Sequence, residues 1–231
     1  MSRQLPLSLG LQHAPSLDDF VVGRNQTLIE VLRHSLEPTG EPVLYLFGPS
    51  GCGRSHLLLG QCAQAEQRGL RCAYLALRDH AKLAPGILDG LETMDLLAFD
   101  DIQLIAGEAA WEEALFALFN RCRDRGTRML FSADCGLAAS PIQLPDLRSR
   151  LAWGLSLSIQ PLDDQGRLDL LQSLATRRAL SLPPDVARYL LERTSRNPSD
   201  LVDTISRLDH ASLAEQRRLT IPFVRDSLKL S

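Results

Sequence analysis

The sequence has 231 residues, of which 45% are hydrophobic and 23% are charged, and its formal net charge at pH 7 is −3. This length suits one large domain or a medium domain with a small one, and the near-neutral charge gives no global basic excess for nucleic-acid binding. Five cysteines without a C-x-x-C pair argue against a disulfide framework and a zinc site. No apolar run is long enough to span a membrane, so we expect a soluble cytoplasmic protein without a membrane partner.

Residues 1–16 are predicted to form a separate N-terminal tail. Two prolines interrupt it, and Leu5, Leu7 and Leu9 alternate as they would in an extended segment. Two interpretations are open at this point. The tail is an edge strand or a disordered leader, or it is a short linear motif that docks in an apolar groove of a partner, with Gln4 supplying hydrogen bonds.

A phosphate-binding loop is predicted after the first strand. An amphipathic helix at about residues 25–36 precedes an apolar strand at Val43–Phe47, and a second helix is expected at about residues 56–67. The sequence GPSGCGRS between strand and helix matches the pattern G-x-x-x-x-G-K-[ST], with Arg54 in place of the lysine. Its glycines let backbone N–H groups surround a phosphate at a helix N-terminus. The alternative is a glycine-rich turn that binds no ligand. The expected nucleotide-binding residues are Gly48, Pro49, Ser50, Gly51, Cys52, Gly53, Arg54 and Ser55.

Two adjacent carboxylates end a later apolar strand. A strand at about residues 72–77 and an interrupted helix at about residues 81–91 lead to the strand at residues 96–101, which ends in Asp100 and Asp101. After a phosphate loop this is the Walker-B arrangement, the alternative being a solvated acidic turn. Asp100 is expected to hold Mg²⁺ together with the hydroxyl of Ser55, and Asp101 is expected to act as the catalytic base that orients the attacking water.

The next elements supply a candidate phosphate sensor and two arginines. A helix at residues 109–125 precedes a strand at residues 128–134, where Ser132 or Asp134 could sense the outer phosphate, because ligands collect at the carboxyl edge of parallel sheets. A short helix within residues 144–154 then presents Arg148 and Arg150 on different faces. One could pair internally, and an outward one is either an ordinary surface residue or an arginine finger for a neighbour's phosphate.

The pattern of predicted secondary structure changes after a final strand at residues 155–159. Helices without strands are predicted at residues 163–178, 184–195, 198–215 and 221–229. The predicted fold class is therefore α/β, a P-loop parallel-sheet domain followed by a small all-helical domain. The expected domain boundaries are 1–16 for the tail, 17–160 for the nucleotide-binding domain and 161–231 for the helical lid.

This order of motifs resembles the AAA+ ATPase module, and four segments resemble the bacterial replication initiator DnaA over about residues 17–231. They are Phe20–Gly23, Asp100–Gln103, Leu147–Leu155 and Ile221–Arg225. The resemblance implies that Gly48–Ser55 and Val22 bind ADP or ATP and that Ser55 and Asp100 bind Mg²⁺. It also implies that Asp134 is the sensor-1 residue and that Arg150 is the arginine finger.

Three features depart from the initiator. The initiator carries a helix-turn-helix domain after its lid, and because this sequence ends at Ser231 we expect no reading of initiator boxes in that way. The segment between Tyr74 and Leu96 is shorter than the initiator's, which puts the initiator's single-strand contacts in doubt. The sensor-2 arginine position falls on Ser199, with Arg196 one turn away. Together with Arg54, a planar fork in place of a compact ammonium, this predicts a module that holds nucleotide, ADP in particular, without efficient turnover.

The tail completes the resemblance, because the segment Gln4–Leu9 is similar to a sliding-clamp-binding peptide. The whole is similar to the DnaA-homologous regulators that inactivate the initiator. This implies that Gln4, Leu5, Leu7 and Leu9 bind the polymerase III sliding clamp, that DNA is met only through the clamp, and that Arg150 stimulates hydrolysis of DnaA-bound ATP in trans. The alternatives are an active ATPase of the helicase-loader type and a structural adaptor, and a homo-oligomer stays possible.

Overall fold

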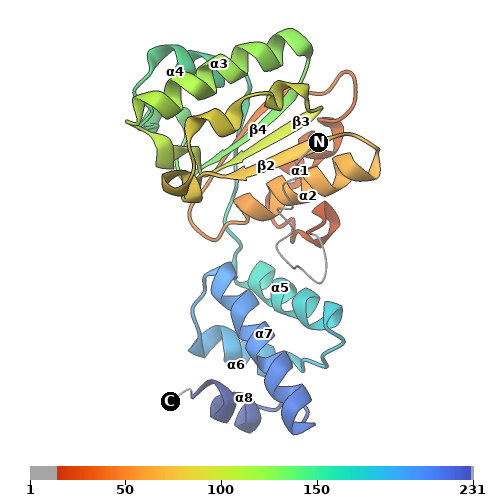
Figure 1. The fold of residues 1–231 in the computed structure, drawn as a ribbon. Coiled ribbons are helices and arrows are strands. Elements are labelled where there is room, and N and C mark those ends of the chain that lie inside the picture. The colour runs from red at the N-terminus through yellow and green to blue at the C-terminus, as the bar shows by residue number, and fades with distance from the viewer. Residues whose placement is uncertain (1–14, 230–231) are drawn as a thin grey trace, which may run out of the picture.

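The computed structural model describes residues 15–229, which fold into a sheet domain and a helical bundle (Figure 1). Five strands form one parallel sheet in the order β2-β3-β4-β1-β5. The predicted fold class, a parallel-sheet α/β domain followed by a helical lid, is confirmed. The strands are β1 (Val43–Phe47), β2 (Cys72–Ala76), β3 (Leu96–Asp100), β4 (Arg128–Ala133) and β5 (Leu155–Ser158).

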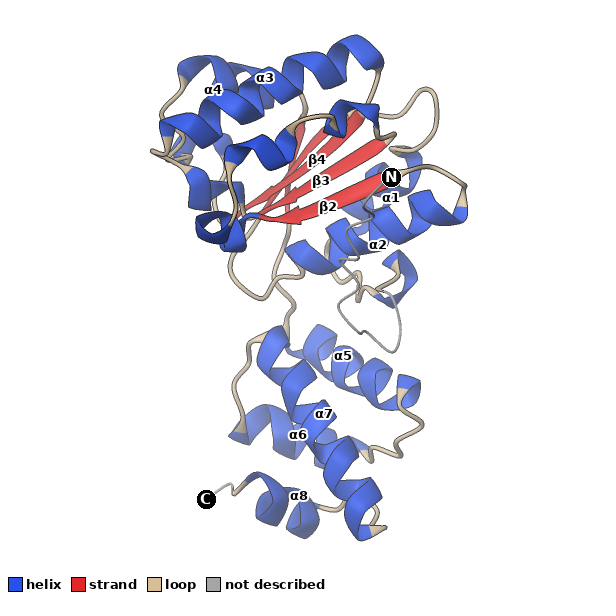
Figure 2. Ribbon diagram, viewed as in Figure 1, coloured by secondary structure: helices blue, strands red, loops and turns tan. Residues whose placement is uncertain are grey.

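Helices cover both faces of the sheet, as Figure 2 shows. On one face α3 (Ala109–Arg125) and α4 (Pro145–Leu151) pack against a core that includes Tyr45 and Phe131. On the other face α1 (Gln26–His34) and α2 (Arg54–Gln67) pack against Leu44 and Leu46. Because alternate residues of a strand point to opposite faces, β1 is apolar throughout and buried on both sides, as parallel strands generally are.

The predicted helix at residues 81–91 is wrong. The segment instead forms three 3-10 turns, Leu77–Lys82, Pro85–Leu88 and Leu91–Thr93. Pro85 opens the second turn, where its missing N–H costs nothing, and Gly90 takes a left-handed backbone with φ of 81° before the third. A continuous helix would need an N–H at Pro85 and a right-handed backbone at Gly90. Further 3-10 turns occur at Leu17–Asp19, Ile102–Ile105 and Leu137–Ala139.

A buried carboxylate fixes α4 to α3. The side chain of Glu112 is 2% exposed, and its oxygens accept hydrogen bonds from the backbone amides of Gly107 (2.7 Å), Gln143 (3.0 Å) and Leu144 (2.6 Å). Leu144 is the N-cap residue of α4. Charge-assisted bonds to several amides stabilise a buried carboxylate and set the geometry around it. The helix that carries Arg148 and Arg150 is therefore held by a rigid anchor.

The lid consists of α5 (Asp164–Arg177), α6 (Pro184–Arg193), α7 (Pro198–Glu215) and α8 (Ile221–Leu228), which share a core of their own. Arg177 of α5 forms an ion pair with Asp19 of the sheet domain (2.8 Å). The side-chain amide of Asn25 donates to the Gln160 carbonyl (3.0 Å) and accepts from the Gln160 amide (2.7 Å), which fixes the segment that leads into the lid. Within residues 15–229, no helix has the length and apolar character needed to cross a membrane.

Candidate nucleotide site

The predicted phosphate loop connects β1 to α2 at the carboxyl edge of the sheet. Gly51 and Gly53 have left-handed backbones with φ of 78° and 98°, which favour glycine. A Cβ at Gly53 would also lie 2.7 Å from Cε2 of Phe20, so the ring of Phe20 closes against the backbone of the loop. Gly51 and Gly53 are therefore required by conformation, and at Gly53 the packing of Phe20 also leaves no room for a side chain.

The loop fits a nucleotide phosphate. Gly53 is the N-cap residue of α2, and no side chain caps this helix start. The first N–H groups of a helix lack intrahelical acceptors, and together with the helix dipole they favour an anion. Within the described residues, the amides of Gly51, Gly53 and Ser55 have no hydrogen-bond acceptor. These free donors match the oxygens of a phosphate group.

Asp100 lies at the centre of a group of hydroxyls. Its side chain is buried, and its oxygens accept hydrogen bonds from Oγ of Ser55 (2.5 Å), from the hydroxyl of Tyr74 (2.6 Å) and from Oγ of Ser132. Burial and the neighbouring carboxylate of Asp100 raise the pKa of Tyr74, so its phenol stays a donor. Sequence reasoning missed Tyr74 altogether.

The pair of Ser55 and Asp100 fits Mg²⁺ of the kind that accompanies a nucleotide. Hydroxyl and carboxylate oxygens are ligands that this cation prefers, and nucleotide sites commonly hold it with one or two such groups plus phosphate oxygens. No cluster of three or more His, Cys, Asp or Glu side chains that could hold a metal occurs in the described part of the chain. The residues present therefore suit a cation that arrives with phosphate.

Arg54 and Asp101 form an internal ion pair. Nη2 of Arg54 lies 2.7 Å from Oδ1 of Asp101, while Nη1 donates to the carbonyl of Gly48 (2.5 Å). Their side chains are only 13% and 19% exposed. Asp101 itself has a left-handed backbone (φ 61°), and its amide donates to Oγ of Ser132 (2.9 Å). The arginine that replaces the phosphate-loop lysine thus joins the loop to the end of β3 and is paired with the candidate catalytic base.

The two candidate phosphate sensors separate in the structure. Ser132 is buried and bonds to Asp100, whereas Asp134 is exposed just beyond the end of β4. Val22 is partly buried in the core under the loop, together with Phe20 and Cys52. Burial raises the pKa of the Cys52 thiol, so this side chain is a neutral packing group.

The lid contributes Asn197, which sequence reasoning missed. A Cβ at Gly51 would overlap the side chain of Asn197, so this residue lies directly over the phosphate loop. Asn197 is the N-cap residue of α7 and accepts from the amide of Ser199 (3.0 Å). An asparagine before Pro198 is a recognisable helix start, but nothing in the sequence aims it at the loop.

The sensor-2 region supplies no cation above the loop. Ser199 is exposed at the start of α7. Arg196, the nearest candidate substitute, has its side chain 61% exposed and pairs with Asp164 of α5 at 3.6 Å. Its guanidinium is therefore engaged within the lid.

Neither arginine of α4 has a hydrogen bond or ion pair with the phosphate loop among the described residues. Arg148 is exposed and Arg150 partly buried, and neither forms an ion pair with any residue in the described range. Arg150 instead lies over the indole of Trp153, with 4.0 Å between its guanidinium carbon and the ring centre. A Cβ at the next residue, Gly154, would lie 2.5 Å from the carbonyl of Val43, which begins β1. The phosphate loop follows the other end of β1, about 13 Å away at a rise of about 3.3 Å per residue.

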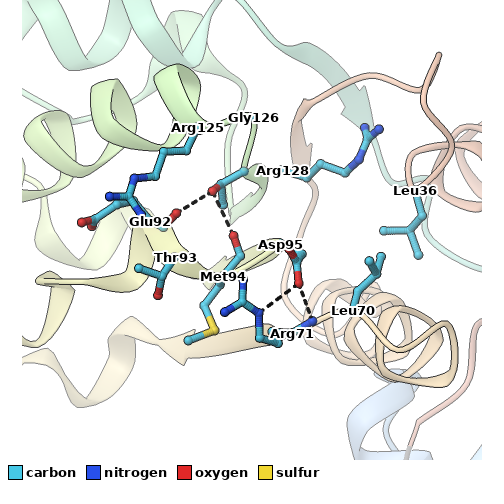
Figure 3. A pocket seen from close by; sticks show the side chains of 11 residues that line it. Leu36, Leu70, Arg71, Glu92, Thr93, Met94, Asp95, Arg125, Gly126 and Arg128 are labelled. Atoms are coloured by element: carbon cyan, nitrogen blue, oxygen red, sulfur yellow. Dashed lines mark hydrogen bonds and ion pairs between the residues drawn. The ribbon is translucent and has the colours of Figure 1, made fainter.

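A cavity of about 680 Å³ lies at the same amino edge of the sheet, away from the phosphate loop. Figure 3 shows Arg71 bonded to Asp95 on its wall, with Arg125 and Arg128 nearby. It contains none of the predicted site residues. Gln4, Leu5, Leu7 and Leu9 of the predicted tail lie outside the described residues.

Comparisons with known proteins agree with this architecture. A family model of the bacterial DnaA ATPase domain matches residues 11–158, and one of the Hda lid domain matches residues 164–228. Domain III of the Thermotoga maritima replication initiation protein DnaA is similar, with a TM-score of 0.79 and 22% identity over 93% of this chain and 95% of that chain. AMPPCP-bound DnaA from Aquifex aeolicus has a TM-score of 0.71 and 26% identity over 87% of this chain and 66% of that chain. The Thermotoga maritima RuvB Holliday junction branch migration motor shares the fold, with a TM-score of 0.71 and 17% identity over 93% of this chain and 71% of that chain.

The ion pair between Arg54 and Asp101 is predicted to stabilise the nucleotide-free protein. We expect a coupling free energy of about 1.5–3 kcal/mol, because both groups are charged and largely shielded from water. The measurement is a double-mutant cycle of Arg54→Gln and Asp101→Asn by urea unfolding. Arg33→Gln with Asp18→Asn is the matched control, since that pair also lies at 2.7 Å but its side chains are 48% and 82% exposed. A coupling no larger than that of the exposed pair would contradict the prediction.

Proposed function

Because this chain belongs to the bacterial DnaA ATPase-domain family and carries an Hda-type lid, we propose that it is a cytoplasmic, nucleotide-binding regulator of replication initiation. On this proposal it associates with ATP-bound DnaA on the DNA-loaded sliding clamp. Arg150 then contacts the phosphates of the ATP bound to DnaA and promotes hydrolysis of that ATP. The result is negative regulation of initiation.

The position of Arg150 is the observation that carries this proposal. A guanidinium that stabilises charge on a transferred phosphoryl group can accelerate hydrolysis by about 10³–10⁵. Arg150 lies at the amino edge of the sheet, whereas the phosphate loop of the same chain follows the carboxyl end of β1. It has no carboxylate partner among the described residues, so its charge is available to another molecule. An arginine in this position can serve only a nucleotide bound elsewhere.

The chain's own site is proposed to hold ADP. Gly48–Ser55 would bind the phosphates with Val22 beside them, and Ser55 and Asp100 would hold Mg²⁺, which would supply positive charge to offset that of the phosphates. Arg54 is already engaged by Asp101, Ser199 offers no cation and Arg196 pairs with Asp164, so a third phosphate gains little. With Asp101 held in an ion pair by Arg54 and Asp134 exposed, we expect weak turnover in this site.

The N-terminal tail is proposed to bring the regulator to its partner. Its sequence supports binding of Gln4, Leu5, Leu7 and Leu9 in the apolar groove of the polymerase III sliding clamp, with DNA contacted only through the clamp. Tethering to a common platform raises the effective concentration of two weakly associating proteins. Clamp and DnaA are therefore bound by separate parts of the chain.

Replacing Arg150 tests the central assignment. We expect Arg150→Ala to abolish the stimulation of ATP hydrolysis by DnaA, because the partner's transition state loses its cation. The variant should still bind nucleotide and clamp, since neither surface includes Arg150. The measurement is release of phosphate from ATP-bound DnaA in the presence of clamp-loaded DNA.

Arg148→Ala is the matched control, because Arg148 lies on the same helix, is exposed and faces another direction. It is expected to retain most of the stimulation. Full stimulation by Arg150→Ala, or an equal loss in both variants, would refute Arg150 as the finger.

A second substitution tests the tail separately. Replacing Leu5 and Leu7 with alanine should remove binding to the clamp, because apolar anchors supply most of the affinity of such short peptides. Leu11→Ala serves as the control outside the motif. The measurement is co-elution with the purified clamp, and unchanged co-elution of the double variant would disprove clamp binding through these residues.

A further inference from the structure

We propose that Trp153 is a positioning residue, whose indole holds the guanidinium of Arg150 ready for the phosphate of the partner's nucleotide. This inference rests on the proposed function of Arg150. It concerns a side chain that no part of the phosphate-loop chemistry uses.

The geometry of the stack is close. The guanidinium carbon of Arg150 lies 4.0 Å from the centre of the Trp153 ring, well inside the range of about 6 Å for cation–π attraction. Arg123, near the end of α3, approaches the same ring at 5.5 Å. Trp153 is 59% exposed, whereas the other tryptophan of the chain, Trp111, is 4% exposed. The exposed indole therefore has two guanidinium groups within cation–π range, that of Arg150 being the nearer.

Backbone contacts make this indole a fixed support. The amide of Trp153 donates to the carbonyl of Arg150 (3.1 Å), which ties the indole to the last turn of α4. The following residue, Gly154, approaches Val43 so closely that no side chain fits there. The other end of α4 is held by Glu112 through the amide of Leu144. Arg150 and Trp153 consequently keep their spacing, because both ends of their segment are anchored to the sheet domain.

A ring is a better support for this arginine than a carboxylate would be. A carboxylate would neutralise the guanidinium and occupy its N–H donors, as Asp101 does with Arg54. A stacked aromatic face attracts the cation but leaves its in-plane donors free. Those donors match phosphate oxygens in a bidentate manner. The stack thus orders a long, flexible side chain while preserving the charge that its phosphate target requires.

The second arginine is distinguishable from the first. Arg123 also pairs with Asp124 at 3.2 Å, so its charge is partly compensated. Among the cations over this indole, Arg150 is the one without an acidic partner in the described chain. This difference identifies Arg150 as the side chain whose guanidinium the indole orients for contact with a phosphate.

The first arm of the test measures the stack without any partner. Acrylamide quenching of tryptophan fluorescence reports mainly on Trp153, because Trp111 is buried. Arg150→Ala should raise the quenching constant by uncovering one face of the indole, and Arg148→Ala should leave it unchanged. Equal quenching in wild type and Arg150→Ala would overturn the inference.

The second arm measures function with conservative rescue. Trp153→Leu should lower the maximal stimulated rate of ATP hydrolysis by DnaA about two- to fivefold, the effect of one exposed cation–π contact. The concentration of regulator that gives half-maximal stimulation should change less. Trp153→Phe keeps an aromatic face and should retain more of the rate than Trp153→Leu. Circular dichroism of both variants checks that the fold is intact.

Several other results would count against the inference. Trp153→Phe and Trp153→Leu could lower the maximal stimulated rate equally, or they could raise only the concentration of regulator that gives half-maximal stimulation. Either result would make the indole a docking contact instead of a support. Binding of a single-stranded oligonucleotide that Trp153→Leu abolishes would assign the stack to nucleic acid. Full stimulation by Arg150→Ala would overturn the proposed function and the inference with it. If Arg150→Ala lowers the stimulated rate of hydrolysis but leaves the quenching constant of Trp153 unchanged, the inference alone is overturned.

Discussion

Two adjacent carboxylates at the end of β3 organise the candidate nucleotide site. Asp100 is buried and accepts hydroxyl donors from α2, β2 and β4 through Ser55, Tyr74 and Ser132. A buried carboxylate that lost these donors would be strongly destabilised, so the elements that carry them are held together at this point. Asp101 takes a left-handed backbone and binds Arg54, which in turn binds the carbonyl of Gly48. The loop, the helix after it and the two neighbouring strands β2 and β4 therefore depend on the end of β3.

Two arginines in contrasting environments explain the division of labour that we propose. Arg54 is shielded from water, paired with an acid and bonded to a carbonyl. Arg150 is supported by an indole at the opposite edge of the sheet and is free of acidic partners within the described residues. The first arrangement leaves no free cation on Arg54 for a third phosphate and so disfavours turnover in the chain's own site, whereas the second favours chemistry on a neighbouring molecule. A structural adaptor or a self-sufficient ATPase would not need an uncompensated arginine at that edge.

Sequence patterns predicted the strands, the phosphate loop and the two carboxylates, because these depend on local periodicity and fixed spacing. Residues 43–47 and 109–125 were assigned with their observed ends, since their apolar patterns and flanking glycines or prolines leave little choice. The helix predicted at residues 81–91 is wrong, because the apolar spacing that indicates it does not outweigh the effects of Pro85 and Gly90.

The partners of the site residues could not be predicted. Arg54 meets Asp101 across 47 positions, and Asn197 reaches Gly51 from another domain. The contact of Arg150 with Trp153 joins neighbours in sequence, but only the folded turn beside Val43 shows that the indole is left exposed. Such contacts follow from how elements pack, which no local pattern records.

The central claim is that ATP is hydrolysed on DnaA and not on this chain. The most direct measurement loads labelled ATP on one protein at a time, mixes it with the other protein and clamp-loaded DNA, and follows a single turnover. We predict that label carried by DnaA is converted to ADP rapidly and only with Arg150 present, while label carried by this chain persists. Rapid conversion of the label carried by this chain, lost on Asp101→Asn and unaffected by Arg150→Ala, would contradict the account and make the protein an ATPase in its own right.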